Sequence, residues 1–133
     1  MLGLNHSARD TFFTDKVKWF ATAKTLKQFD LAIALASWSA VDPKTLVRAA
    51  RDHVKSQPAF ALESALLALH WMARGAGYEL TSVDVWAARD HALAAAQTLA
   101  SDAEADHAAK RIAEAVAGNG APAIWVRQSL GLR

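Results

Sequence analysis

Three polar residues of the segment 58–74 have the types and the spacing that proton-transfer chemistry requires. Glu63, His70 and Arg74 stand at positions i, i+7 and i+11, so a helix would place them along one strip. A histidine between a carboxylate and a guanidinium can act as a general acid or base near neutral pH. The solvent-facing edge of a mostly buried helix has the same composition, and the sequence favours this second interpretation.

Arg89 is a second candidate, because its position predicts a charged group inside an apolar helix face. Its neighbours on that face are Val85, Ala92, Leu93 and Ala96. A guanidinium buried there needs a partner or water. We therefore expect Arg89 to pair with an acid, with Glu63 as the first choice, or to line a cleft and bind an anionic ligand. Snorkelling of the side chain to the helix edge is a further alternative.

Four basic residues of the segment 43–56 form a row on one helix face, which we call the basic stripe. It consists of Lys44, Arg48, Arg51 and Lys55. A row of cations can follow the phosphate backbone of a nucleic acid. However, no helix-turn-helix signature or aromatic-interleaved basic motif accompanies it. A solvated face, partly neutralised by Asp52, is the simpler interpretation.

Two tryptophans, Trp19 and Trp125, are candidates for contacts with a partner. Trp125 follows a Gly-Asn-Gly loop, and it either docks on its own domain or presents an aromatic anchor to another chain. The remaining tryptophans lie among apolar residues and are expected in the core: Trp38, Trp71 and Trp86.

No pattern in the chain predicts a catalytic residue, a metal site or a cofactor. Glu104 and His107 form one Glu-x-x-His sequence, whereas a di-iron site needs two of these and two further carboxylates. No Ser-His-Asp spacing, glycine-rich phosphate loop or paired-acid motif stands out. The chain has no cysteine, which excludes thiolate ligands and cysteine nucleophiles.

The composition bounds the class of protein. The 133 residues are 53% hydrophobic and 21% charged, which suits one folded domain and is too apolar for disorder. Residues 1–57 contain nine Lys/Arg and five Asp/Glu, and residues 58–133 contain six and eight. This asymmetry permits an anionic partner without requiring one. The longest apolar run, residues 31–36, is far shorter than the roughly 20 residues of a membrane span. With no signal peptide evident, we expect a cytoplasmic protein that does not enter a membrane.

Capping residues, prolines and glycines predict where the helices begin and end. Capping-box pairs are Ser7/Asp10, Thr25/Gln28, Thr81/Asp84 and Ser101/Glu104. Prolines at 43 and 58 mark further starts, and glycines at 75, 77 and 118 mark ends. The apolar periodicity then predicts helices at 8–23, 26–40, 43–56, 58–74, 82–100 and 102–117. A short last helix runs from 122 to about 131, and no strand is expected.

A recurring pentapeptide suggests how these helices are organised. Ala49–His53 and Ala87–His91 are identical, 38 positions apart, and Ala8–Asp10 is a fainter copy. A period of about 40 residues is that of helical hairpin repeats. Because alanine makes up 31 of the 133 residues, chance recurrence is the alternative. We predict an all-α fold, either a compact bundle or a short right-handed stack of about three hairpins. Residues 1–117 would form one domain, and 118–133 a C-terminal tail or short docking helix.

The function that these predictions favour is a non-enzymatic helical module that binds a protein partner or itself. One alternative is a nucleic-acid accessory protein that uses the basic stripe. The other is a small-anion-binding protein or an enzyme with a cleft near His70 and Arg89. A pocket that contains both of these residues would support the last interpretation.

Overall fold

Six helices lie in the part of the chain that the computed structural model describes, residues 29–38, 41–77, 79–99 and 102–132. The described residues contain no strand, so the predicted all-α class is confirmed. The chain divides into two compact units, residues 1–41 and 42–133. No helix in the described ranges is long and apolar enough to cross a membrane.

The first unit contains α2 (Phe29–Trp38), within the helix predicted at 26–40. Ala32 and Ala36 are buried, whereas Leu31 is 48% exposed. The helix predicted at 8–23, the residue Trp19 and the cap pairs Ser7/Asp10 and Thr25/Gln28 lie outside the described residues.

In the second unit, α3 (Pro43–His53) and α4 (Pro58–Ala73) begin at the prolines that the sequence indicated. A carboxylate oxygen of Asp42 accepts the N–H of Lys44 at 3.1 Å and so caps α3. α3 ends at His53, three residues before the predicted end at 56. The Nδ1–H of His53 donates to the carbonyl oxygen of Ala49 at 2.8 Å, which satisfies one acceptor of that last turn.

The remaining helices are α5 (Ser82–Thr98), α6 (Asp102–Ala115) and α7 (Ala121–Ser129). At the start of α5 the carboxylate of Asp84 accepts the backbone N–H of Thr81 at 2.8 Å, the return bond of the predicted capping box. α5 and α6 each end two residues before the prediction, which is within the usual uncertainty of helix ends.

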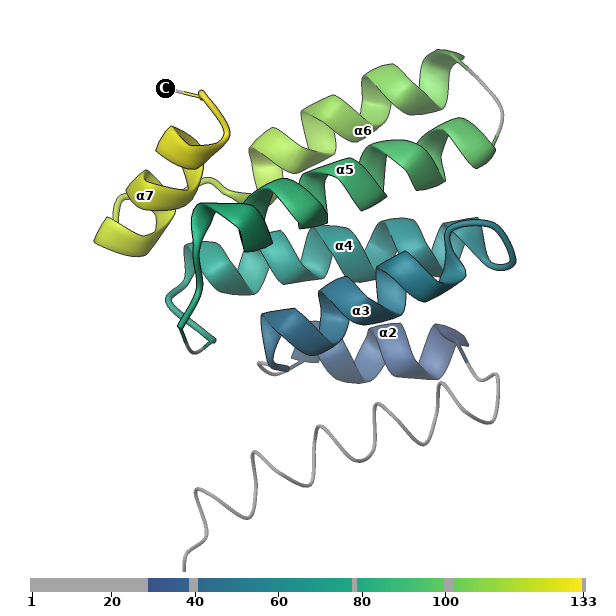
Figure 1. Ribbon diagram of the computed structural model, residues 1–133, viewed down its shortest axis with the longest axis horizontal. Helices are drawn as coiled ribbons and strands as arrows, with labels where there is room; N and C mark the ends of the chain where they lie inside the picture. The colour runs from purple at the N-terminus through teal and green to yellow at the C-terminus, as the bar shows by residue number, and fades with distance from the viewer. Residues whose placement is uncertain (1–28, 39–40, 78, 100–101, 133) are drawn as a thin grey trace, which may run out of the picture. The chain divides into compact units, whose positions relative to one another are not determined.

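The second unit is built around α4, which contacts α3, α5, α6 and α7 (Figure 1). Both α4 and α5 bury several alanines, whose small side chains allow neighbouring helices to approach closely: Ala61, Ala65 and Ala68 on α4, and Ala88, Ala92 and Ala95 on α5, all fully buried. The largest fully buried side chains of this unit include Leu46, Leu69, Met72, Val85, Val116 and Val126. The arrangement is a helical bundle, and the hairpin repeat stays a prediction.

The C-terminal segment packs within this unit. α7 contacts α4 and α5, with Ala123 and Val126 buried. Arg127 donates through Nη1 to the carbonyl oxygens of Val116 at 2.9 Å and Gly118 at 2.7 Å. These bonds hold the segment that follows α6 against α7. Gly118 has φ +144°, a backbone conformation that side-chain-bearing residues rarely adopt.

Candidate functional site

A hollow of about 280 Å³ lies between α4 and α6, and we call it the α4–α6 hollow. Its lining comes from Glu63, Leu66, Leu67 and His70 of α4 and from Arg111, Glu114 and Ala115 of α6. The α4 residues stand at i, i+3, i+4 and i+7, and the α6 residues at i, i+3 and i+4. Each set therefore occupies one helix face. Two members of the predicted polar strip, Glu63 and His70, thus share a concavity with charges from α6.

An ion pair between α4 and α6 forms part of the wall of the hollow. Arg111 donates to the carboxylate of Glu63 in a bidentate arrangement, Nη1 to Oε2 at 2.5 Å and Nη2 to Oε1 at 2.7 Å. The expected pairing of Glu63 with Arg89 is therefore wrong. Glu63 lies on the side of α4 that faces α6, whereas Arg89 belongs to α5. Periodicity assigned Glu63 to a helix face but could not indicate which helix packs against that face.

Arg74 joins the same two helices at the other end of α4. Its Nη1 donates to the carbonyl oxygen of its own helix neighbour His70 at 3.0 Å and to that of Ala115, in the last turn of α6, at 3.2 Å. A guanidinium at a helix C-terminus satisfies an acceptor that has no partner within the helix and opposes the helix dipole. Arg74 therefore positions α6 against α4.

His70 lies between these two joints and is half-buried. Burial lowers the pKa of His70 below the usual 6.5, and the positive charge of Arg74 lowers this pKa further. The imidazole meets the ring of Trp71 edge-on, with ring centroids 4.7 Å apart. No hydrogen bond joins His70 to Glu63 in the structure as described, and both carboxylate oxygens of Glu63 already accept from Arg111. The carboxylate that would orient a catalytic histidine is thus engaged elsewhere.

Arg89 does not line the hollow, so His70 and Arg89 do not share it. The Nε of Arg89 lies 3.1 Å from a carboxylate oxygen of Asp90, and the Arg89 side chain is 36% exposed. The aliphatic part of Arg89 lies beside the buried residues Val85 and Ala92, while the guanidinium reaches a neighbouring acid at the surface.

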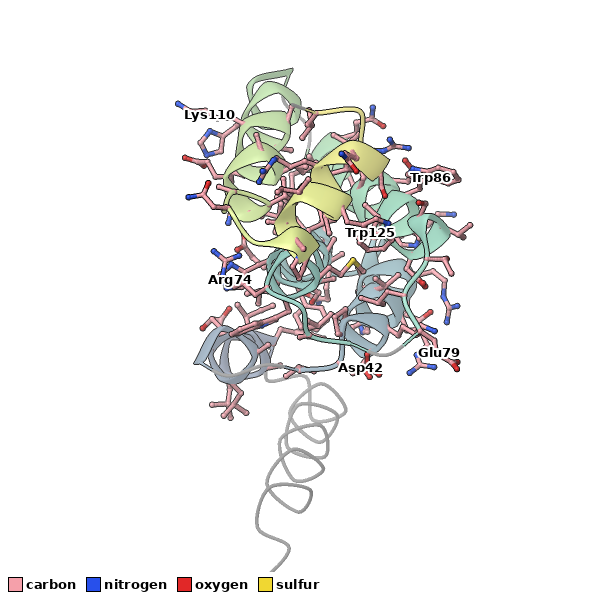
Figure 2. All side chains as sticks on the ribbon, turned by 90° about the vertical axis from the view of Figure 1, so that its left-hand side faces the viewer. Asp42, Arg74, Glu79, Trp86, Lys110 and Trp125 are labelled. Atoms are coloured by element: carbon pink, nitrogen blue, oxygen red, sulfur yellow. The ribbon has the colours of Figure 1, made fainter. Side chains whose placement is uncertain are left out.

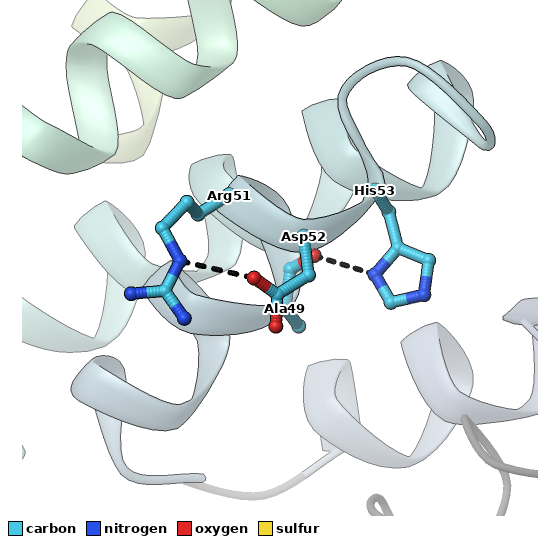
Figure 3. A network of polar contacts seen from close by, with 4 residues as sticks. All are labelled: Ala49, Arg51, Asp52 and His53. Atoms are coloured by element: carbon cyan, nitrogen blue, oxygen red, sulfur yellow. Dashed lines mark hydrogen bonds and ion pairs between the residues drawn. The ribbon is translucent and has the colours of Figure 1, made fainter.

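The basic stripe is shorter than predicted and partly neutralised. Lys44, Arg48 and Arg51 lie on α3, but Lys55 falls in the turn after the helix end at His53. Figure 3 shows Arg51 turned toward its neighbour Asp52, with Nε and a carboxylate oxygen 3.0 Å apart.

The two copies of the recurring pentapeptide form the same local ion pair. Arg51–Asp52 and Arg89–Asp90 both join Nε to Oδ1, at 3.0 and 3.1 Å. The histidines that follow lie in different surroundings. The ring of His53 packs edge-on against Phe60, with centroids 5.1 Å apart.

His91 instead stands within α5 and is half-buried. Burial has the largest effect on the pKa of His91 and lowers it. The negative charges of Asp90 and Asp52 raise this pKa, and the positive charge of Arg51 lowers it. The two copies are therefore electrostatic neighbours across the contact between α3 and α5.

Two tryptophans that were expected in the core, Trp71 and Trp86, are not fully buried. Trp86 was predicted to lie in the core, but it is 43% exposed, and its indole N–H donates to the carbonyl oxygen of Ser129 at 2.7 Å. The buried side of α5 passes through Val85 and Ala88, and Trp86 lies about 100° around the helix from Val85. Trp71 and Trp125 are half-buried, the latter within docked α7. The side chain of Trp38 lies outside the described part of the structure.

Trp86 belongs to a solvent-exposed side of α5 that the sequence analysis missed, and we call it the α5 open face. It comprises the exposed residues Val83, Trp86 and Asp90 and the half-buried residues Ala87 and Ala94. Val83 is 65% exposed and the side chain of Asp90 is 64% exposed. A sign of it was present in the sequence, because Val83, Trp86, Ala87 and Ala94 are apolar and share a side of the helix away from its buried residues.

Among the described residues, no three His, Asp or Glu side chains gather closely enough to hold a metal ion. No protein-family model, curated protein or solved structure matches the chain. The molecule's own side chains and their geometry are therefore the basis for inferring its function.

Proposed function

We propose that the chain is a helical interaction module that binds an amphipathic helix of a partner protein on the α5 open face. The observation that supports this most directly is the exposure of Val83 and Trp86 at i and i+3 on one side of α5. Exposed aromatic and aliphatic side chains next to each other are typical of the centre of a protein interface.

The polar atom of Trp86 is compatible with burial by a partner. Its indole N–H already donates to Ser129, so a partner can cover the ring without leaving a buried donor unpaired. Farther along the face, Ala87 and Ala94 present only methyl groups, which allows another helix to approach closely.

Charge favours a different protein over a second copy as the partner. A two-fold axis through the middle of the face, between Ala87 and Ala94, would set Asp90 of one copy opposite Asp90 of the other. Like charges that face each other oppose association. The exposed carboxylate of Asp90 suits a partner helix with a basic residue at its centre.

The other two functions have weaker support. A nucleic-acid role would rest on the basic stripe, in which Arg51 is paired with Asp52 and Lys55 lies beyond the helix. An enzymatic role near His70 lacks an orienting carboxylate, because Glu63 is engaged by Arg111.

Site-specific photo-crosslinking in the native cells tests the proposal. A photoreactive amino acid replaces Val83 on the open face or, as the matched control, Ala113, an exposed residue of α6. We expect a discrete cross-linked protein from position 83 and none from position 113. Cross-links to the same chain would indicate a homodimer, and equal cross-links from both positions would indicate non-specific capture; either result contradicts the proposal.

The affinity of the purified partner for variants of the chain then tests whether the α5 open face is the binding surface. Val83→Asp should weaken binding at least about tenfold, because it places a charge at the interface centre. The variant should fold, since an acid in the first turn of a helix is favourable. Ala113→Asp should leave the affinity unchanged. Tighter binding by Asp90→Lys would contradict the basic character inferred for the partner.

A further inference from the structure

A second feature lies on another side of the unit: Figure 2 places Arg74, beside the α4–α6 hollow, and Trp86, on the α5 open face, at opposite sides. We propose that the α4–α6 hollow binds a small organic cation, an ammonium or guanidinium group on a short apolar chain. This inference does not depend on the proposed protein partner, because the two surfaces share no residue.

The size of the hollow limits the class of ligand. Its volume of about 280 Å³ is just below the range of about 300–1,000 Å³ that most ligand pockets occupy. It has room for a molecule the size of one amino-acid side chain, whereas a nucleotide or a large cofactor would extend well beyond it.

The charges of the lining favour a cation. Two carboxylates, Glu63 and Glu114, stand against one guanidinium, Arg111. Both oxygens of Glu63 already accept from Arg111, so this pair is mutually satisfied. Glu114 is exposed, and within the described ranges its carboxylate has no hydrogen-bond or ion-pair partner. Its carboxylate is therefore the group that is available to an incoming cation.

No cationic group of the lining is available to an anion in the way that the Glu114 carboxylate is available to a cation. It would have to compete with Glu63 for Arg111, and it would meet the negative charge of Glu114. One nitrogen of Arg74 already donates to His70 and Ala115, and Arg74 does not line the hollow. The geometry thus disfavours the small-anion ligand that the sequence left open for this region.

His70 and the apolar lining complete the site. Because burial and Arg74 lower its pKa, His70 is neutral at pH 7 and above, so it offers a ring nitrogen to a donor and does not repel a cation. Leu66, Leu67 and Ala115 supply apolar surface for the methylene groups of the ligand. The charged groups around His70 are Glu63 and Arg74 on α4, and Arg111 and Glu114 on α6.

The test is an NMR titration of the full chain with three four-carbon probes: n-butylammonium, n-butylguanidinium and, as the anionic counterpart, n-butyrate. We expect both cations to shift the amide signals of residues that line the hollow, with dissociation constants on the order of millimolar for molecules of this size. Butyrate should cause no saturable shift there. Binding of butyrate as tight as that of the cations, or cation-induced shifts confined to other regions, would overturn the proposal.

Two variants identify the groups involved. Glu114→Gln should weaken cation binding about tenfold, and it should fold, because it removes an acid from the unfavourable C-terminal turn of α6. The matched control Glu79→Gln alters an exposed carboxylate outside the hollow and should change nothing. Equal losses in both variants would show a general charge effect and contradict the site.

The pH dependence provides a second readout. Lowering the pH from 8 through the pKa of His70, which burial and Arg74 hold below 6.5, should weaken cation binding, because the protonated ring repels the ligand. His70→Gln should remove most of this pH dependence while it retains binding at pH 8. A pH dependence that is the same in this variant would show that His70 does not face the ligand.

Discussion

α4 and α5 are neighbours of similar length, 16 and 17 residues, and both are rich in alanine and other apolar residues. Ten residues of α4 are buried, but only five of α5. α4 packs extensively against α3 and α5, whereas α5 packs extensively on α4 alone and meets α3, α6 and α7 less closely. The more enclosed helix is also the more apolar, with twelve apolar residues of 16 in α4 against ten of 17 in α5. The difference in composition thus accompanies the closer packing of α3 and α5 on α4.

The polar residues of the two helices differ in the same way. On α4, Glu63 and Arg74 each bind α6, so the polar strip is a joint between helices. On α5, Arg89 turns to its own neighbour Asp90 and leaves the open face uncovered. Polar groups of α5 also hold a neighbour, since the indole N–H of Trp86 donates to Ser129 of α7, but α5 in addition leaves Val83 and the ring of Trp86 exposed for a partner outside the unit.

The largest expected effect is a loss of stability in α4. Leu69 is fully buried, so Leu69→Ala should lower the free energy of unfolding by about 2–5 kcal/mol. Val83→Ala on α5 removes carbons from an exposed side chain and should cost under about 0.5 kcal/mol. Urea denaturation monitored by circular dichroism measures both. Similar losses would show that the two helices do not differ in enclosure.

Next in size is the coupling between Glu63 and Arg111. A double-mutant cycle with Glu63→Gln and Arg111→Met should give a coupling free energy of about 0.5–1 kcal/mol, since the pair is bidentate but about one-third exposed. The control cycle of Glu63→Gln with Arg89→Met should give no coupling, because Arg89 pairs with Asp90. Coupling in the control cycle would restore the pairing that the sequence suggested.

The sequence predicted the features that depend on nearby residues. The starts of α3 and α5 followed from Asp42 and from Thr81 with Asp84, because a cap needs only residues within one turn. The all-α class followed from periodicity, which is also local. The helix ends were less accurate, because no strong stop signal follows His53 or Thr98.

The candidate site could be predicted only in part, because its α6 residues are far in sequence from its α4 residues. Glu63 and His70 were placed on one face of α4, but Arg111 lies 48 positions after Glu63. Their contact depends on how α6 docks. Trp86 was misplaced for the same reason, since only the arrangement of neighbouring helices shows which apolar side of α5 remains open.

A smaller effect is expected from pH. Burial lowers the pKa of both His70 on α4 and His91 on α5 in the folded state, so between these pKa values and about 6.5 the unfolded chain binds more protons. The stability that results is fully present above pH 6.5 and is lost as the pH falls through the folded-state values. Urea midpoints should decrease from pH 7.5 to 5.5, and His70→Gln should reduce that decrease. NMR titration of the His70 ring should give a pKa below 6.5; a pKa above it would contradict the burial of this side chain.

The smallest expected effect concerns the basic stripe, which lies on α3 and contributes to neither surface proposed for α4 or α5. Arg51 is paired with Asp52 and Lys55 lies outside the helix, so few cations remain aligned for a phosphate backbone. At physiological salt we expect no affinity for duplex DNA or for single-stranded RNA tighter than about 1 μM, measured by fluorescence anisotropy. Replacing Lys44 and Arg48 by Gln should then leave the salt dependence of any residual binding nearly unchanged. A tighter affinity, with a salt slope that decreases by about one unit for each cation removed, would instead make α3 the functional helix of this unit.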